Sequence, residues 1–275
     1  MKNKLFIIEG LPCTGKSTTS KFVSDFLLKE GHTVSYYDEG SLEHPADYEF
    51  HGFMENNDLQ ILNSEELKQV QDIGYMKKSG LVIPLSKVNG ELFDKIIPFK
   101  IYDCLPWNTE KTIMLEHWKE FTNKAYNEDI IYIFNCCFLQ NPLCEMMMRF
   151  NFPYENIQKY IINIFEYIKT LNPIIIYLQN SNVKERVSEI AKERDDEWLK
   201  NVIDYHTSQG YGKANSFEGF DGYISCLEER QRVELKILKQ LSIAFAIPMD
   251  SSSVGIIPAN KKSTSASLNK SACHE

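Results

Sequence analysis

The chain has 275 residues, of which 43% are hydrophobic and 25% are charged, and its formal net charge is -8. This length suits one large α/β domain with insertions, and the composition excludes a collagen-like or disordered polymer. The negative charge repels phosphate backbones and anionic lipid, and no basic patch offsets it, so we expect no nucleic acid and no membrane among the partners.

Two further features bear on the location of the protein. No apolar run reaches the roughly 18 residues that a membrane helix requires, and the first apolar run is too short for a signal peptide. The 7 cysteines show no paired metal spacing, which indicates reduced thiols. We therefore expect a cytoplasmic protein, and we keep a homodimer as an option.

Short apolar runs alternate with helical patterns along the chain. The first run, residues 4–8, is too short and too uniformly apolar for an amphipathic helix, and a helical pattern over 17–29 follows it. Similar runs predict further strands at 33–37, 130–134, 174–178 and 243–247. Strands with intervening helices predict an α/β fold with a doubly wound, mainly parallel five-stranded sheet.

The connection between the second and third predicted strands is far longer than the few residues of an ordinary loop. Residues 41–129 are therefore predicted to form a largely helical insertion within a single domain that spans 1–260. Residues 261–275 are polar, rich in Ser and Lys and free of apolar periodicity, which predicts a mobile C-terminal tail.

One motif carries a specific chemical signal. Residues 10–17, Gly-Leu-Pro-Cys-Thr-Gly-Lys-Ser, match the phosphate-loop pattern G-x-x-x-x-G-K-[ST] between a predicted strand and a helix. The glycines let the backbone wrap an anion, and the N–H groups at the helix start point at it. We expect ATP to be bound by Gly10, Cys13, Thr14, Gly15, Lys16, Ser17 and Thr18. In this interpretation Lys16 holds the β- and γ-phosphates and Ser17 is a ligand of Mg²⁺.

The arrangement resembles the nucleoside and nucleotide kinases, and the thymidylate-kinase-like proteins in particular. The resemblance rests on Ile-Ile-Glu-Gly at 7–10 leading into the loop, on an acid after the second strand, and on 174–178 followed by Val-Lys-Glu-Arg at 183–186. In that group the segment after the fourth strand is an arginine-bearing lid that closes on the phosphates. The resemblance implies a lid at about 184–225, with Arg186 and Arg194 as catalytic residues.

Two acids follow the second predicted strand. Asp38 and Glu39 stand where related kinases keep the carboxylate that accepts a proton from the substrate hydroxyl. The carboxyl ends of strands face the ligand crevice in open α/β sheets, which suits this task. Asp38 is the first choice for the catalytic base and Glu39 for a magnesium-shell acid, but which of the two is the base stays open. An ordinary acidic turn with Gly40 is the alternative.

Three further features of the sequence are less specific indications of function. The third predicted strand ends in Asn135, where phosphate-loop enzymes commonly place an aspartate that orients the magnesium shell. Asparagine supplies no charge, so either Glu39 compensates or hydrolytic turnover is weak. His206 lies in a stretch rich in Gly and aromatic residues, and a lone histidine is more often structural than catalytic. The charges at 228–232 are predicted to form the solvated face of a helix.

The leading hypothesis is an ATP-dependent kinase that transfers the γ-phosphoryl group to a hydroxyl or phosphate of a small molecule. Candidate acceptors are nucleosides, nucleotides and antibiotic-like alcohols, and the sequence does not decide between them. Lys16 and the lid arginines would stabilise the transferring group, while Asp38 would orient the attacking oxygen. The alternative is a nucleotide-dependent switch or regulatory ATPase that holds a protein partner with the long insertion, which Asn135 slightly favours.

Overall fold

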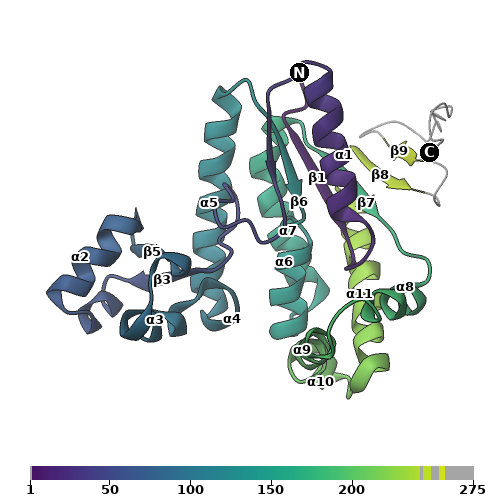
Figure 1. Cartoon of the computed structure of the whole chain (residues 1–275). Coiled ribbons are helices and arrows are strands. Elements are labelled where there is room, and N and C mark those ends of the chain that lie inside the picture. Colours follow the sequence, from purple (N-terminus) through teal and green to yellow (C-terminus); the bar gives the residue numbers. More distant parts are fainter. Residues whose placement is uncertain (1, 242–243, 249–253, 258–275) are drawn as a thin grey trace. The chain divides into compact units, whose positions relative to one another are not determined.

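The computed structural model describes residues 2–241, 244–248 and 254–257. The chain divides into two compact units, one made of residues 1–39 with 122–275 and the other of residues 40–121. The division falls within helix α5 (Trp107–Asn127). Figure 1 labels most of the helices and strands of both units. The predicted tail at 261–275 lies outside the described residues.

The first unit is built on a mainly parallel sheet. Its strand order is β2 (Val34–Tyr37), β6 (Ile131–Asn135), β1 (Leu5–Gly10), β7 (Ile174–Leu178), β8 (Ala244–Pro248) and β9 (Val254–Ile257). The pairs from β2 to β8 are parallel, whereas β9 pairs antiparallel with β8. The prediction of a mainly parallel sheet in an α/β fold is confirmed. The antiparallel strand β9 was not among the predicted strands.

Strand β1 lies inside this sheet, between β6 and β7. Leu5, Ile7 and Ile8 are fully buried, and strands that are buried on both faces appear in a sequence as continuous apolar runs. Gly10 is opposite Leu178 in the parallel register, and Ile8 is opposite Asn135. The segments that follow β1, β2 and β6 therefore emerge at the same edge of the sheet.

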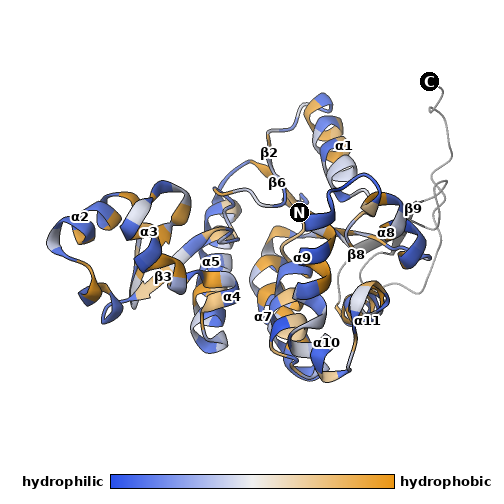
Figure 2. Ribbon diagram, turned by 60° about the horizontal axis from the view of Figure 1, so that its bottom comes forward, coloured by the Kyte–Doolittle hydropathy of each residue, from blue (hydrophilic) through white to orange (hydrophobic). Residues whose placement is uncertain are grey.

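The helices of the first unit pack around this sheet. They are α1 (Lys16–Lys29), α6 (Gln140–Leu143), α7 (Tyr154–Ile168), α8 (Val183–Ala191), α9 (Asp196–Thr207), α10 (Gly210–Ala214) and α11 (Gly219–Gln240), with the π-helical turn η4 (Cys144–Arg149) and the 3₁₀ turn η5 (Lys169–Leu171). Helix α1 contacts β1, β2 and β6, and α11 contacts α7, α8 and α9. Figure 2 shows both hydrophobic and hydrophilic residues on α7, and its buried residues Ile157, Ile161, Ile164 and Ile168 recur every three or four positions, as in an amphipathic helix.

The second unit contains a small antiparallel sheet of order β3 (His51–Glu55), β5 (Gly80–Pro84) and β4 (Tyr75–Lys77). Its helical elements are η1 (Asp58–Ile61), α2 (Ser64–Ile73), η2 (Leu85–Lys87), α3 (Gly90–Ile96), η3 (Ile97–Phe99) and α4 (Ile101–Cys104). Met54, Val70 and Leu81 belong to a core of buried residues within this unit. The prediction of a largely helical insertion missed the sheet, because β5 holds a short buried apolar run but β3 and β4 show neither a continuous apolar run nor a regular alternation.

Within the described part of the chain, no helix combines the length and the apolar character needed to cross a membrane. None of the six cysteines that the structure describes, from Cys13 to Cys226, forms a disulfide.

Candidate functional site

The phosphate loop joins β1 to α1 at the carboxyl edge of the sheet. Gly10 has a φ of +145°, and a Cβ at this position would lie 2.6 Å from the carbonyl oxygen of Leu178. Gly15 has a φ of +86° and directly precedes the first residue of α1. The hydroxyl of Thr14 donates to the carbonyl oxygen of Leu11 at 2.9 Å. The loop thus leads into a helix N-terminus, whose free N–H groups favour a bound anion.

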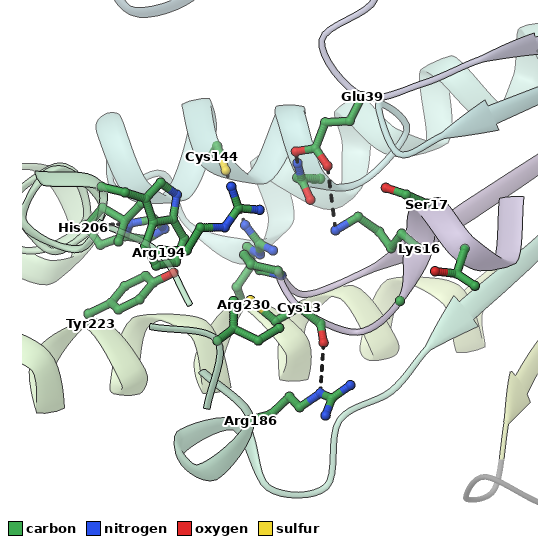
Figure 3. A pocket seen from close by; sticks show the side chains of 17 residues that line it. Cys13, Lys16, Ser17, Glu39, Cys144, Arg186, Arg194, His206, Tyr223 and Arg230 are labelled. Carbon is green, nitrogen blue, oxygen red and sulfur yellow. Dashed lines mark hydrogen bonds and ion pairs between the residues drawn. The ribbon is translucent and has the colours of Figure 1, made fainter. Parts of the chain in front are cut away.

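Lys16 is the buried cation of the loop. Its side chain is 6% exposed, and Nζ donates to the carbonyl oxygen of Leu11 at 3.2 Å. Nζ also lies 3.9 Å from Oε2 of Glu39, whose other oxygen accepts a hydrogen bond from Nε2 of Gln140 at 2.5 Å. Figure 3 shows the side chains of Lys16 and Glu39 pointing toward one another. The ammonium group therefore faces a carboxylate across the opening of the loop.

A cavity of about 580 Å³ extends from the loop. Most of the predicted site residues line it, namely Cys13, Gly15, Lys16, Ser17, Thr18, Glu39, Arg186 and Arg194. Three predicted site residues, Gly10, Thr14 and Asp38, are not among the lining residues. Gly10 and Thr14 shape the backbone of the loop, as described above.

Asp38 connects to the loop through Asn135. Nδ2 of Asn135 donates to Oγ of Ser17 at 3.0 Å and also to Oδ1 of Asp38. Asn135 is buried at the end of β6, whereas Asp38 is exposed after β2. Asp38 therefore supplies the negative charge next to Ser17, and the neutral amide links the two side chains. Glu39, by contrast, turns to Lys16 and Gln140.

The two predicted lid arginines come from the segment after β7. Arg186 lies on α8, and its Nε donates to the carbonyl oxygen of Cys13 at 3.2 Å. Arg194 lies between α8 and α9, and its guanidinium carbon is 5.7 Å from the centre of the Trp198 ring. Both side chains reach the cavity that the phosphate loop opens into.

Glu9 is a site residue that the sequence analysis did not single out. Its buried carboxylate accepts the backbone N–H groups of Phe138 and Leu139 at 2.8 Å and that of Gln140 at 3.3 Å. Burial, and then repulsion by Glu234, raise the pKa of Glu9 to about 7, against the opposing effect of these N–H donors. Glu9 holds the segment after β6 and so positions Gln140 beside Glu39.

The prediction of a solvated charged face at 228–232 is wrong for Arg230, which lies on helix α11. Arg230 is only 1% exposed and lines the cavity, while Arg232 pairs with Glu229 on the surface. Nε of Arg230 lies 3.2 Å from Oε1 of the fully buried Glu234, one helical turn further on. Arg230 shares its face with the apolar residues Val233 and Ile237, and this helical spacing was the signal that the sequence offered.

Glu234 has a second buried partner. The hydroxyl of Tyr177, on β7, donates to Oε2 of Glu234 at 2.5 Å. Burial raises the pKa of Glu234, and the charge of Arg230 acts in the opposite direction. The carboxylate neutralises one edge of the Arg230 guanidinium.

His206 also lines the cavity, although the sequence favoured a structural role. It is 7% exposed, and Nδ1 lies 2.7 Å from the carbonyl oxygen of Val202. A carbonyl oxygen only accepts, so we assign the proton to Nδ1 and a lone pair to Nε2. Burial, with a smaller contribution from the charge of Arg230, lowers the pKa of His206 to about 4. The imidazole is therefore neutral at pH 7.

Comparisons with known proteins add little to this description. No family model matches the chain, and no curated protein matches it. Among solved structures, one described as "Crystal structure of APE1195" is similar at a TM-score of 0.32 and 15% sequence identity, over 86% of this chain and 97% of that one. A TM-score this low supports no conclusion about fold or function.

Proposed function

We propose that this chain is an ATP-dependent kinase that transfers the γ-phosphoryl group to a small molecule. The proposal rests on one observation: a complete phosphate loop whose Lys16 reaches a cavity that Glu39 and two lid arginines also line. The parallel strand order β2, β6, β1, β7 and β8, with the loop after β1, supports the proposal, since it agrees with the mainly parallel five-stranded sheet predicted from the apolar runs.

The residues of the loop fit a magnesium-bound ATP. The N–H groups at the start of α1 would bind the phosphates, Lys16 would hold the β- and γ-phosphates, and the hydroxyl of Ser17 would be a magnesium ligand. Among the described residues no cluster of three or more side chains of metal-ligating type occurs. This suits an ion that takes most of its ligands from phosphate oxygens and water. Bound Mg²⁺ supplies charge neutralisation at the β- and γ-phosphates.

The geometry favours Glu39 rather than Asp38 as the catalytic base. Glu39 lines the cavity beside Lys16, whereas Asp38 is linked through Asn135 to Ser17. In the proposed step the acceptor hydroxyl passes its proton to Glu39 as its oxygen bonds to the γ-phosphorus. The bond from the γ-phosphorus to the bridging oxygen breaks and ADP leaves. Lys16 and the lid arginines would stabilise the charge that develops on the phosphoryl oxygens.

A regulatory ATPase or switch is the second candidate, and one observation favours it. Asn135 is neutral where phosphate-loop enzymes commonly have an acid, and its side chain already donates to Ser17 and Asp38. A slow nucleotide cycle that signals to a protein partner through residues 40–121 would tolerate this. The kinase proposal is preferred because a switch does not need the lid arginines at the loop.

The test is ADP formation with and without a panel of nucleosides, nucleotides, sugars and aminoglycosides. The kinase proposal predicts that ADP forms with an acceptor and that Lys16→Ala lowers this rate on the order of 10³-fold. Lys21→Ala is the matched control, because Lys21 is an exposed lysine on the same helix. ADP formation that no acceptor stimulates would favour the switch, and full activity in Lys16→Ala would remove the loop from the mechanism.

A further inference from the structure

The cavity is lined by a guanidinium group whose hydrogen-bond donors are not all paired by the described residues. Arg230 is 1% exposed, and its Nη1 donates to Sγ of Cys144 at 3.3 Å. Its Nε lies close to Glu234 without the alignment of a hydrogen bond. Within the described part of the chain Nη2 has no hydrogen-bond partner. Nε thus faces a carboxylate and Nη1 a thiol, while Nη2 keeps its donors open.

A buried donor without a partner is unfavourable, and more so when it carries a charge. Guanidinium is a planar fork whose parallel N–H groups match two oxygens of a carboxylate or a phosphate. The cysteine thiol is a weak acceptor and does not replace such a partner. Because Arg230 lines the cavity, a ligand oxyanion is the group that would complete its hydrogen bonds.

Two open acceptors lie in the same cavity. Nε2 of His206 and Oε1 of Gln140 have no hydrogen-bond partner among the described residues, although these side chains are only 7% and 9% exposed. The neutral imidazole offers a lone pair at Nε2, and an amide oxygen only accepts. Both positions therefore call for a ligand that donates hydrogen bonds, as a hydroxyl or an amine does.

These open groups lie away from the part of the loop that would hold the triphosphate. Figure 3 shows His206 and Tyr223 across the cavity from Ser17, with Arg230 between them and Lys16. The His206 ring lies 4.8 Å from that of Tyr223, and the charge of Arg230 acts on both residues. The open donors of Arg230 thus belong to the region left for an acceptor.

From this we infer, resting on the proposed function, that the phosphoryl acceptor is an acidic small molecule whose carboxylate or phosphate is bound by Arg230. Hydroxyl or amine groups of the same molecule donate to His206 and Gln140. Gln140 also donates to Glu39, so a ligand hydroxyl that donates to Gln140 would bring a neighbouring hydroxyl of the same molecule beside the proposed base. A neutral alcohol oxygen would accept one hydrogen bond from Arg230 but would not offer the two charged oxygens that the guanidinium fork matches.

The test uses the full chain saturated with Mg²⁺ and a non-hydrolysable ATP analogue, so that the phosphate loop is filled. Calorimetry then compares matched neutral and acidic probes, namely glucose with glucose 6-phosphate, glycerol with glycerate, and adenosine with AMP. Inorganic phosphate and acetate serve as minimal probes that separate phosphate from carboxylate recognition. We expect at least one acidic probe to bind tenfold or more tightly than its neutral partner.

Two variants of Arg230 and one control test whether Arg230 causes this preference for acidic probes. Arg230→Lys keeps the charge beside Glu234 but removes the fork, and Arg230→Gln with Glu234→Gln removes the buried pair without leaving a lone charge. Arg232→Gln is the matched control, because Arg232 is exposed on the same helix. We expect both changes at Arg230 to weaken the acidic probe tenfold or more, while the control and the affinity for the ATP analogue stay unchanged.

The inference is overturned if no acidic probe is preferred while the analogue binds normally, or if the folded Arg230 variants keep the preference. Failure of the analogue itself to bind would instead contradict the proposed function. An acidic probe that binds and also stimulates ADP formation from ATP would support both the inference and the proposed function. Circular dichroism of each variant identifies those that are folded and therefore count.

Discussion

Asp38 and Glu39 are adjacent in the sequence but have different partners. Asp38 reaches Ser17 through Asn135, and Glu39 lies beside Lys16 and Gln140. Strand β2 ends at Tyr37, so both side chains belong to the turn that leaves the sheet at its carboxyl edge. Two acids at one position of the fold can therefore serve two tasks.

The corresponding variants should separate these tasks. Glu39→Gln removes the proposed base, so we expect phosphoryl transfer to fall roughly 10²- to 10⁴-fold while the affinity for ATP holds. Asp38→Asn removes the charge near Ser17, so we expect weaker magnesium-dependent ATP binding. Calorimetry beside a transfer assay measures both quantities. A larger loss of transfer in Asp38→Asn, with unchanged ATP binding, would return the base to Asp38.

The buried imidazole of His206 makes a pH-dependent contribution to stability. Its folded pKa of about 4 lies below the ordinary value of 6.5, so the unfolded chain takes up this proton first as the pH falls. The contribution is complete above about pH 6.5 and is lost as the pH falls through about 4, at up to about 1.4 kcal/mol per pH unit. Urea unfolding of the wild type and of His206→Gln should show the difference.

This comparison has its own control. His44 is also buried, and its pKa is lowered to about 3, so it contributes to the acid sensitivity of both proteins and cancels in the difference. A wild-type stability that falls in parallel with that of His206→Gln between pH 6.5 and 4 would show that the imidazole is not held neutral.

At the scale of single elements, helix α2 carries a complete capping box. The side chain of Asn63 accepts the N–H groups of Glu65 and Glu66, and the carboxylate of Glu66 accepts the N–H of Asn63. Asn63→Ala should therefore lower the free energy of unfolding by about 1 kcal/mol. Asn57→Ala is the matched control, since Asn57 precedes a 3₁₀ turn without a side-chain cap bond. Equal losses in both would contradict the role of the cap.

The strands of the parallel sheet could be predicted because burial on both faces gives a local signal, a continuous apolar run in the sequence. The apolar runs at 4–8, 130–134 and 174–178 correspond to β1, β6 and β7 within two residues at each end. The antiparallel sheet left a weaker signal, because β5 holds the buried run Leu-Val-Ile at 81–83 but β3 begins with His-Gly and β4 is largely exposed. Its strands hold three to five residues, and their pairing is a tertiary choice that the sequence pattern does not contain.

Helix α11 shows the opposite case, in which a charged stretch hides a buried group. The run Glu-Glu-Arg-Gln-Arg at 228–232 predicts a solvated face from composition. Arg230 is nevertheless buried, because Glu234 one turn later and Cys144 on η4 give it polar partners inside the unit. Glu234 lies on the same helix, but Cys144 and Tyr177 meet this pair only in the folded chain, so composition alone could not show that the pair is buried.

At the scale of the whole molecule, the candidate site is assembled from segments far apart in the sequence. The loop and the acids after β2 could be predicted, because a motif and the position of strand ends define them. Glu9 and His206 could not be assigned in the same way. Their roles depend on which backbone groups and side chains the fold brings to them, such as the N–H groups after β6.

The division of the chain into two compact units matters for measurements of stability. The cavity and the residues that line it belong to the first unit, and the capping box belongs to the second. A ligand stabilises the state that binds it, by about 2.7 kcal/mol at a concentration 100-fold above its Kd. If the two units unfold in separate transitions, a ligand therefore stabilises the transition of the first unit, whereas Asn63→Ala destabilises that of the second.

Calorimetric titration of ATP with Mg²⁺ into the wild type, Lys16→Ala and Lys21→Ala tests the assignment of the loop most directly. We predict saturable binding to the wild type and to Lys21→Ala, at least tenfold weaker binding to Lys16→Ala, and weaker binding when EDTA removes the metal. Equal affinity in all three proteins, or no binding to the folded wild type, would contradict a nucleoside triphosphate at this loop.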